Sequence, residues 1–196
     1  MESLTIGFAI CGSFCTFSKV LPEMEKLVEK GYNVLPIMSS VAYSTDTRFG
    51  KAKDFTDKIE SICNKKIIST ISDAEPIGPK KLLDALIIAP CTGNTAAKLA
   101  CGICDSSVTM AAKASLRNSI PVVIGLATND GLSQSAKSLG IVLATKNVYF
   151  VPLGQDSPYK KPTSLVCDFD KIEPTIQSAL KGEQIQPLID VYPKSI

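Results

Sequence analysis

The chain has 196 residues, the size of one domain with or without an extension. Hydrophobic residues make up 45% and charged residues 20%, as in folded globular proteins, so the composition excludes a disordered or fibrous chain. The net charge is only +2 with the signs interleaved, which argues against a nucleic-acid partner. Histidine is absent, which excludes mechanisms that need an imidazole.

The seven cysteines are an odd number, and the first residues show no cleavable signal pattern. Both features predict reduced thiols in the cytoplasm. The longest apolar runs, such as 120–127, fall far short of the roughly 18 residues that span a bilayer, so no membrane partner is expected.

The first part of the chain alternates apolar strands with amphipathic helices. Residues 4–11 predict a strand, and apolar residues at helical spacing between Val20 and Val28 predict a helix that Gly31 ends. A second strand is expected over 33–38 and a second helix over 52–63.

The same alternation continues after a short β-prone stretch at 66–71. Further strands are predicted over 83–89, which Pro90 ends, over 120–126 and, as the last strand, over 147–153. Further helices are predicted over 92–100, 108–116, 130–139 with Gly140 as its cap, and 168–181.

This order of elements predicts a mostly parallel sheet with helices on both faces. Residues 1–153 are expected to form the α/β domain, and residues 154–196 a loop, a helix and an arm that pack on the same domain. Ligands of such sheets bind beyond the carboxyl ends of the strands.

Four strand ends therefore merit a search for a site, and each carries small hydroxyl or amide side chains. They are Gly12-Ser13, Ser39-Ser40, the segment 90–95 and the segment 127–130. Glycine, hydroxyl and amide groups beside a helix N-terminus favour phosphate binding, although single Ser, Thr and Asn residues also serve as helix N-caps. The chain has neither a G-x-G-x-x-G after its first strand nor a Walker A motif.

The segment 88–105 carries a family fingerprint. Pro90, Asn94, Thr95, Ala97, Lys98, Ala100, Gly102 and Asp105 match, in register, the pattern Pro-Ala-Ser-Ala-Asn-Thr and its following helix. The chain thereby resembles the flavoprotein family of homo-oligomeric flavin-containing cysteine decarboxylases, from the first strand to about Pro152.

The resemblance implies a Rossmann-like (flavodoxin-like) three-layer αβα sandwich that binds FMN between the subunits of a trimer or a dodecamer of trimers. The residues implied as cofactor contacts are Gly12, Ser13, Phe14, Ser39, Thr92, Asn94 and Thr95. The family's catalytic His is missing from 72–77, and of its Pro-Ala-Met-Asn-x-x-Met-Trp motif only Asn129 remains. These departures argue against decarboxylation of a cysteinyl substrate.

Within the family, the chain is most similar to subunits that work with a separate nicotinamide-dependent dehydrogenase chain in sporulating bacteria. The match lies in the segments 13–17, 90–95, 127–132 and 150–156. It implies an oxidoreductase subunit that helps to form a pyridine dicarboxylate in the mother-cell cytoplasm, with NADP brought by the partner subunit. The alternatives are a non-catalytic scaffold that binds flavin or only phosphate and, less favoured, an FMN-dependent decarboxylase.

A dicarboxylate calls for cationic or amide groups near the strand ends. The candidate substrate contacts are Lys98, Asn129 and Asp130; Arg48 and Lys51 are also available, unless they belong to a solvated loop.

The cysteines carry one further hypothesis. Cys101 and Cys104 could form a redox dithiol or half a metal site, but the pair follows a predicted helix instead of opening one, so packing thiols and no metal are expected. Cys91 is either a thiolate in the phosphate loop or, as we favour, a small buried spacer.

Overall fold

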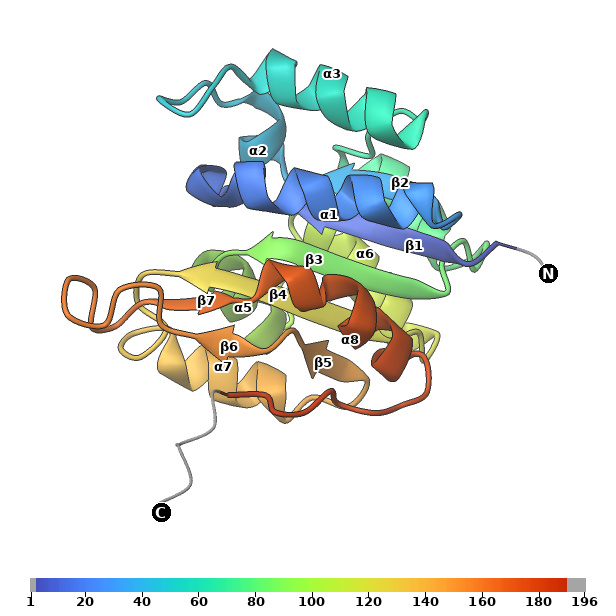
Figure 1. The fold of residues 1–196 in the computed structure, drawn as a ribbon. Helices are drawn as coiled ribbons and strands as arrows, with labels where there is room; N and C mark the ends of the chain where they lie inside the picture. The colour runs from blue at the N-terminus through green and yellow to red at the C-terminus, as the bar shows by residue number, and fades with distance from the viewer. Residues whose placement is uncertain (1–2, 190–196) are drawn as a thin grey trace.

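A seven-stranded, mostly parallel sheet forms the centre of the molecule (Figure 1). The computed structural model describes residues 3–189. The strand order is β2-β1-β3-β4-β7-β6, and β5 also pairs with β4. The parallel strands are β1 (Thr5–Ile10), β2 (Asn33–Met38), β3 (Ala85–Cys91), β4 (Val122–Thr128) and β5 (Val148–Phe150).

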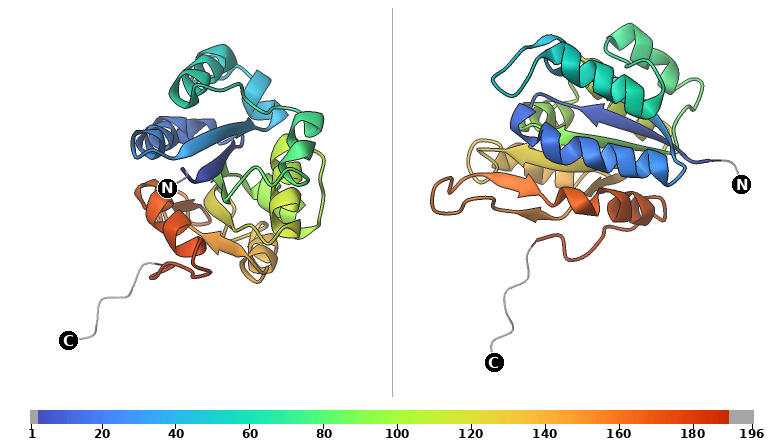
Figure 2. Two further views of the ribbon diagram at one scale, coloured as in Figure 1. Left: turned by 90° about the vertical axis from the view of Figure 1, so that its right-hand side faces the viewer. Right: turned by 45° about the horizontal axis from the view of Figure 1, so that its top comes forward.

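Helices cover both faces of this sheet, as the left view of Figure 2 shows. On one face lie α1 (Phe17–Glu29) and α8 (Ile172–Ala179), and on the other lie α5 (Gly93–Ala100), α6 (Ser107–Arg117) and α7 (Ala136–Leu143). Every residue of β3 is buried, as expected for a parallel strand covered on both sides. The predicted three-layer, flavodoxin-like Rossmann-type sandwich is confirmed.

Shorter elements connect these layers. They are η1 (Phe14–Thr16), α2 (Ser40–Ser44), α3 (Ala52–Cys63), α4 (Ile71–Ala74), η2 (Glu75–Ile77) and η3 (Phe169–Lys171). The β-prone stretch 66–71 contributes a single bridge, from Ile68 to Ile37, before α4 begins.

Two predicted boundaries are wrong. Pro90 does not end its strand, because β3 runs on to Cys91 across a register shift against β4. A proline lacks an N–H but keeps its carbonyl, and the Pro90 oxygen accepts a hydrogen bond of 3.2 Å from the Cys11 N–H. Gly140 does not cap the helix after β4, since it lies inside α7, which begins only at Ala136.

The strand at 147–153 is not the last one. It divides into β5 and β6 (Leu153–Gly154), and β7 (Leu165–Cys167) follows. β7 pairs antiparallel with the end of β4 at Ala127 and Thr128, beyond the part of β4 that pairs with β5. The segment after residue 153 therefore adds strands to the same sheet.

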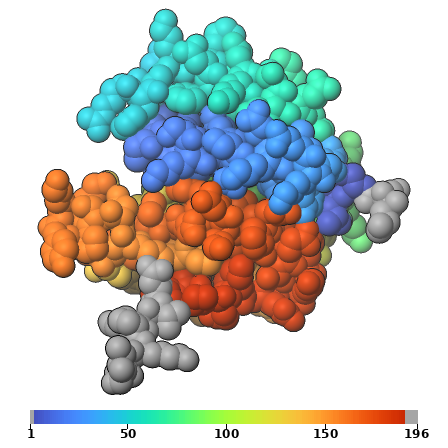
Figure 3. Space-filling view, in the orientation of Figure 1, coloured from blue at the N-terminus to red at the C-terminus, as the bar shows by residue number. Residues whose placement is uncertain are grey.

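The C-terminal segment lies against α1, as Figure 3 shows in red beside blue. Lys30 forms an ion pair with Glu173 of α8, and Gln177 donates a hydrogen bond to the Tyr32 hydroxyl. Gln184 bonds to both the N–H and the carbonyl of Phe150. Residues 190–196 of the expected arm lie outside the described residues, and the packing of the arm as a whole stays a prediction. Between residues 3 and 189 there is no helix with the length and apolar character that a membrane crossing requires.

Replacement of Ile124 by Ala tests the double-sided burial of the sheet. Ile124 is completely buried in β4, and the loss of a buried isoleucine side chain costs about 2–5 kcal/mol. Urea unfolding should show this decrease in the free energy of unfolding. Ile141→Ala, at a side chain that is 53% exposed, should change it by less than about 0.5 kcal/mol. Equal effects of the two substitutions would contradict the layer arrangement.

Candidate functional site

The carboxyl ends of β1, β2 and β3 surround a cavity of about 380 Å³. This volume lies within the range of small-ligand sites. Its lining residues come from these three strand ends, from α5 and from the start of α6: Cys11, Gly12, Ser39, Ser40, Val41, Thr92, Asn94, Thr95, Lys98, Asp105 and Ser106. The structure thus brings together three of the four strand ends that the sequence singled out.

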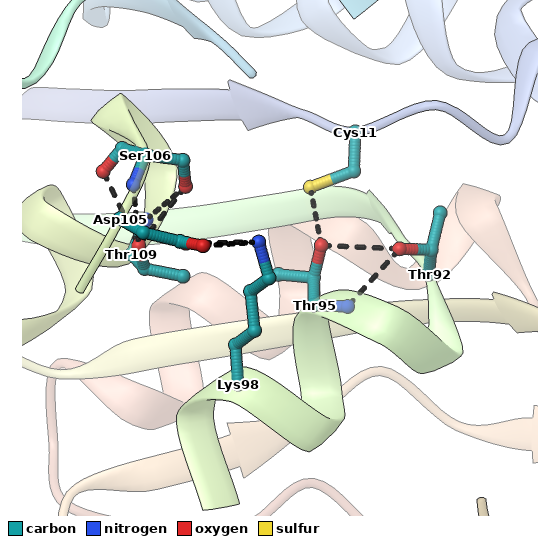
Figure 4. Close-up of polar contacts among 7 residues, drawn as sticks. All are labelled: Cys11, Thr92, Thr95, Lys98, Asp105, Ser106 and Thr109. Carbon is teal, nitrogen blue, oxygen red and sulfur yellow. Dashed lines mark hydrogen bonds and ion pairs between the residues drawn. The ribbon is translucent and has the colours of Figure 1, made fainter. Parts of the chain in front are cut away.

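The N-terminus of α5 forms one wall of the cavity. Thr92 is its N-cap, and the Thr92 Oγ1 accepts the Thr95 N–H at 3.2 Å (Figure 4). The hydroxyls of Thr92 and Thr95 lie 3.0 Å apart, and the Thr95 hydroxyl donates to the Cys11 sulfur at 3.2 Å. The N–H of Asn94, in the first turn, has no acceptor inside the helix and belongs to a residue that lines the cavity, so it is available to an anion, whereas Gly93 is buried and does not line the cavity.

The other two strand ends leave open backbone beside this helix. Ser39 caps the short helix α2, where its Oγ accepts the Ala42 N–H at 3.3 Å. A β-carbon at Gly12 would lie 3.4 Å from the side chains of Phe14 and Val41. Without that carbon, the Gly12 backbone is open to a close approach by a ligand.

The charges that line the cavity cancel each other. The Lys98 Nζ lies 2.7 Å and 2.9 Å from the two Asp105 carboxylate oxygens (Figure 4). The other lining side chains are uncharged at neutral pH, because burial raises the pKa of the Cys11 thiol to about 11. An anion bound here would therefore be held by hydroxyl, amide and N–H dipoles.

The fourth strand end supports α5 from behind and does not line the cavity. The Asp130 Oδ1 accepts hydrogen bonds from the hydroxyls of Thr128, at 2.5 Å, and Ser135, at 2.9 Å. Both hydroxyl oxygens face Gly93, where a β-carbon would lie 2.6 Å from each of them. Asn129 is exposed. The role of Asn129 and Asp130 as substrate contacts stays a prediction.

Other predicted residues lie around the cavity without lining it. Ser13 and Phe14 follow Gly12, and the Phe14 ring packs on Phe17 at 5.3 Å between centroids. Arg48 lies over the Phe49 ring at 4.9 Å, on the exposed loop that also carries Lys51.

All seven cysteines are free thiols. Cys101 follows the last residue of α5, so the C-x-x-C pair does close a helix, but Cys101 is exposed, so the predicted packing role is wrong for this thiol. Cys91 is buried, and burial raises its pKa well above the usual range, which favours the spacer role. Among residues 3–189, no group of three or more His, Cys, Asp or Glu side chains is placed to hold a metal ion.

Some lining residues had no assigned role at the sequence level. Asp105 and Ser106 reach the cavity because the chain turns back between α5 and α6. Ser106 and Thr109 form a capping box at the start of α6, and this Ser-x-x-Thr spacing was the available signal. Cys11 lines the cavity because it directly follows the last residue of β1.

The match to a family model now identifies the protein's family. The Flavoprotein model matches residues 1–176. The chain belongs to the Flavoprotein family. It is 46% identical to the B subunit of dipicolinate synthase from Bacillus subtilis (strain 168) over 189 residues, which cover 96% of this chain and 94% of that protein.

Solved structures of the Flavoprotein fold agree with this assignment. A crystal structure of the dipicolinate synthase B subunit from Bacillus halodurans C has a TM-score of 0.88 and 44% identity, covering 97% of this chain and 99% of that one. DmrB of Burkholderia xenovorans, described as a cubic protein cage for redox transfer and solved with FMN, has a TM-score of 0.65 at 15% identity, covering 92% and 97%. The second likeness shows the shared fold.

Thr92→Ala tests the N-cap of the cavity wall. Because the Thr92 hydroxyl accepts the Thr95 N–H, its loss should lower the free energy of unfolding by about 1 kcal/mol. Thr92→Ser keeps the hydroxyl and should restore most of this loss in the same urea titration. If the alanine variant is as stable as the wild type, this cap does not hold α5.

Asp130→Asn tests the carboxylate behind Gly93 through its pH dependence. The hydrogen bond from Thr128, and then the one from Ser135, hold the pKa of Asp130 below its usual range. The charged form therefore stabilises the fold above the unfolded pKa of about 4, and this contribution is lost as the pH falls towards the lower folded pKa. Urea unfolding from pH 7 to 3 should show the wild type more stable than the variant at pH 7 and the gap closing below about pH 4. A gap independent of pH would contradict this role.

Proposed function

We propose that this chain serves as the B subunit of a dipicolinate synthase. With a nicotinamide-dependent A subunit, called the dehydrogenase subunit below, and NADP, it would help to convert dihydrodipicolinate to dipicolinate in the mother-cell cytoplasm of a sporulating bacterium. The support is the similarity to the Bacillus subtilis protein along 96% of this chain, together with the match to the Flavoprotein model.

The cavity at the strand ends is the observation that supports a ligand-binding role. Three strand ends and a helix N-terminus converge on a space of about 380 Å³ with donors that carry no charge. Such an arrangement suits the phosphate of a cofactor, because a helix N-terminus attracts an anion while Lys98 is already neutralised by Asp105.

The residues present fit FMN, the cofactor in the DmrB structure. The N–H of Asn94 and the hydroxyls of Thr92 and Thr95, with the open backbone at Gly12, would hold the phosphate and the chain attached to it. When bound, FMN supplies a ring that accepts or releases two electrons with protons. Ser13, Phe14 and Ser39 would complete the contacts at the first two strand ends.

The chain's own residues would fix the hydroxyl groups of the cavity wall and set the charge of the cavity. Cys11 stays a neutral thiol, since burial raises its pKa to about 11, and it fixes the Thr95 hydroxyl by accepting its hydrogen bond. Lys98 is the one cation that lines the cavity among residues 3–189. A substrate carboxylate bound there would have to share Lys98 with Asp105, so we expect further cations to come from another chain.

The reaction removes a hydride and a proton from the dihydropyridine ring, and the hydride passes to NADP on the dehydrogenase subunit. No histidine is available on this chain to move the proton. That absence favours the second candidate, a scaffold that binds flavin or phosphate and supports the dehydrogenase subunit without touching substrate. The absence of histidine also argues against decarboxylation of a cysteinyl substrate, because the family resemblance implies that this reaction uses a catalytic histidine. For the assembly, we propose a trimer or a dodecamer, a closed oligomer like the DmrB cage.

Reconstitution tests the proposed function. This chain and the dehydrogenase subunit, separately and together, are assayed with dihydrodipicolinate generated in situ, and dipicolinate absorbance is followed with NADP and with or without FMN. We expect faster formation when both chains are present. If the dehydrogenase subunit works at the same rate with and without this chain, a catalytic partnership is contradicted. A dependence on this chain without any response to FMN, once bound flavin has been removed, would favour the scaffold.

Asn94→Asp tests the flavin site directly. A carboxylate beside the first turn of α5 repels a phosphate, so the affinity for FMN, measured by fluorescence quenching, should fall at least about 10-fold. The matched control Asn147→Asp adds the same charge before β5, outside the cavity, and should bind like the wild type. Equal FMN affinities of the wild type and both variants would place the flavin elsewhere.

A further inference from the structure

A second cavity, of about 400 Å³, lies between α4, η2 and the outer side of α6. We call it the α4–α6 groove. Its lining residues are Ile71, Ser72, Glu75, Pro79, Met110, Lys113, Ala114 and Arg117. None of them lines the cavity at the strand ends, so the proposed cofactor site leaves this groove without a role.

One stripe of α6 forms a wall of the groove. Met110, Lys113, Ala114 and Arg117 are spaced three, four and seven residues from the first, which places them on the same helical face. Met110 is half-buried and presents apolar surface, Ala114 is buried beneath it, and Ile71 on the opposite side is 39% exposed. The floor can therefore bury an apolar side chain of an occupant.

The rim of the groove carries positive charge that the chain does not neutralise. Lys113 and Arg117 are exposed, one helical turn apart, and neither forms an ion pair with any carboxylate of residues 3–189. Glu75 is the one carboxylate in the lining, and it too forms no ion pair within that range. Exposed cations without an ion-pair partner favour an occupant that carries carboxylates.

The Arg117 side chain lies close to the loop that follows η2. A β-carbon at Gly78 would lie 2.7 Å from the Arg117 Nη2, so the absence of a side chain there lets the guanidinium lie on the loop after η2. Asn118 ties the same loop to α6 by donating to the carbonyls of Gly78, at 2.9 Å, and Ala114, at 3.1 Å.

The groove runs along α6 from Met110 to Arg117, whereas the cofactor cavity reaches only the N-cap of this helix. Ser106, which caps the helix, lines the cavity, whereas Arg117 is the last helical residue and lines the groove. Figure 2 shows α6 along the face opposite α1. Eleven residues of helix span roughly 16 Å, so an occupant at the Arg117 end would leave the cavity free.

We propose that the α4–α6 groove docks an acidic segment of the dehydrogenase subunit. Carboxylates of that segment contact Lys113 and Arg117, and an apolar side chain enters between Ile71 and Met110. This inference rests on the proposed function, which supplies the partner. The inference specifies the surface on which the partner binds and the charged and apolar contacts that hold it there.

A double charge reversal, Lys113→Glu with Arg117→Glu, tests the docking. The affinity for the purified dehydrogenase subunit is measured by titration calorimetry with the full chain at about 50 and 300 mM salt, on either side of physiological screening. We expect the wild type to bind more weakly at high salt, and the variant to bind at least about 10-fold more weakly than the wild type at low salt.

The matched control is Lys137→Glu with Lys146→Glu. Both lysines are exposed, lie in or just after α7, away from the groove, and form no ion pair within residues 3–189. This control carries the same change in net charge and should bind the dehydrogenase subunit within about two-fold of the wild type, because long-range charge is screened. Circular dichroism confirms that each variant is folded.

Several results would overturn the inference. If the wild type and the groove variant bind the dehydrogenase subunit equally well, the partner docks elsewhere and the proposed function stands. If the wild type forms no complex with it, the proposed function fails together with the docking. If the groove variant changes only the oligomeric state, measured by light scattering, the groove joins copies of this chain. If inorganic phosphate raises the Tm of the wild type but not of the variant, while both bind the partner equally, the groove is a small-anion site.

Discussion

The close approach of Gly93 to the end of β4 is the contact on which the site depends. Asp130 gathers the hydroxyls of Thr128 and Ser135, and Gly93 packs directly on them. Any side chain at Gly93 would collide at 2.6 Å, so a larger residue would push α5 away from the sheet. Because α5 carries Asn94, Thr95 and Lys98, this one contact sets the position of a whole wall of the cavity.

The charge of that cavity is set by the ion pair between Lys98 and Asp105. Lys98 and Asp105 neutralise each other, and a buried Cys11 thiol remains protonated. The site therefore offers N–H and hydroxyl dipoles that can bind a phosphate, but it has little net charge with which to bind a dicarboxylate. Under the proposed function, the chain would hold a cofactor and share the recognition of substrate with a second chain.

Helix α6 connects the two features that an enzyme of two different chains would need. Its capped start at Ser106 contributes to the cofactor cavity, and its last turn presents Lys113 and Arg117 to the surface. A rigid, well-capped helix keeps the distance between these ends fixed. The proposed docking at the Arg117 end would therefore leave the strand ends accessible.

The sequence by itself determined the alternation of strands and helices up to β5 and the sandwich, and it predicted a site at the strand carboxyl ends, because apolar periodicity and glycine turns are local signals. It also pointed to Thr92, Asn94 and Thr95 through a family fingerprint. Tertiary structure decided the rest. Only the fold could show that β7 returns antiparallel beside β4, that Asp130 supports Gly93 from behind, and that Asp105 neutralises Lys98. Each of these depends on contacts between segments whose sequence spacing carries no signal of their meeting, since long-range packing sets which side chains face each other.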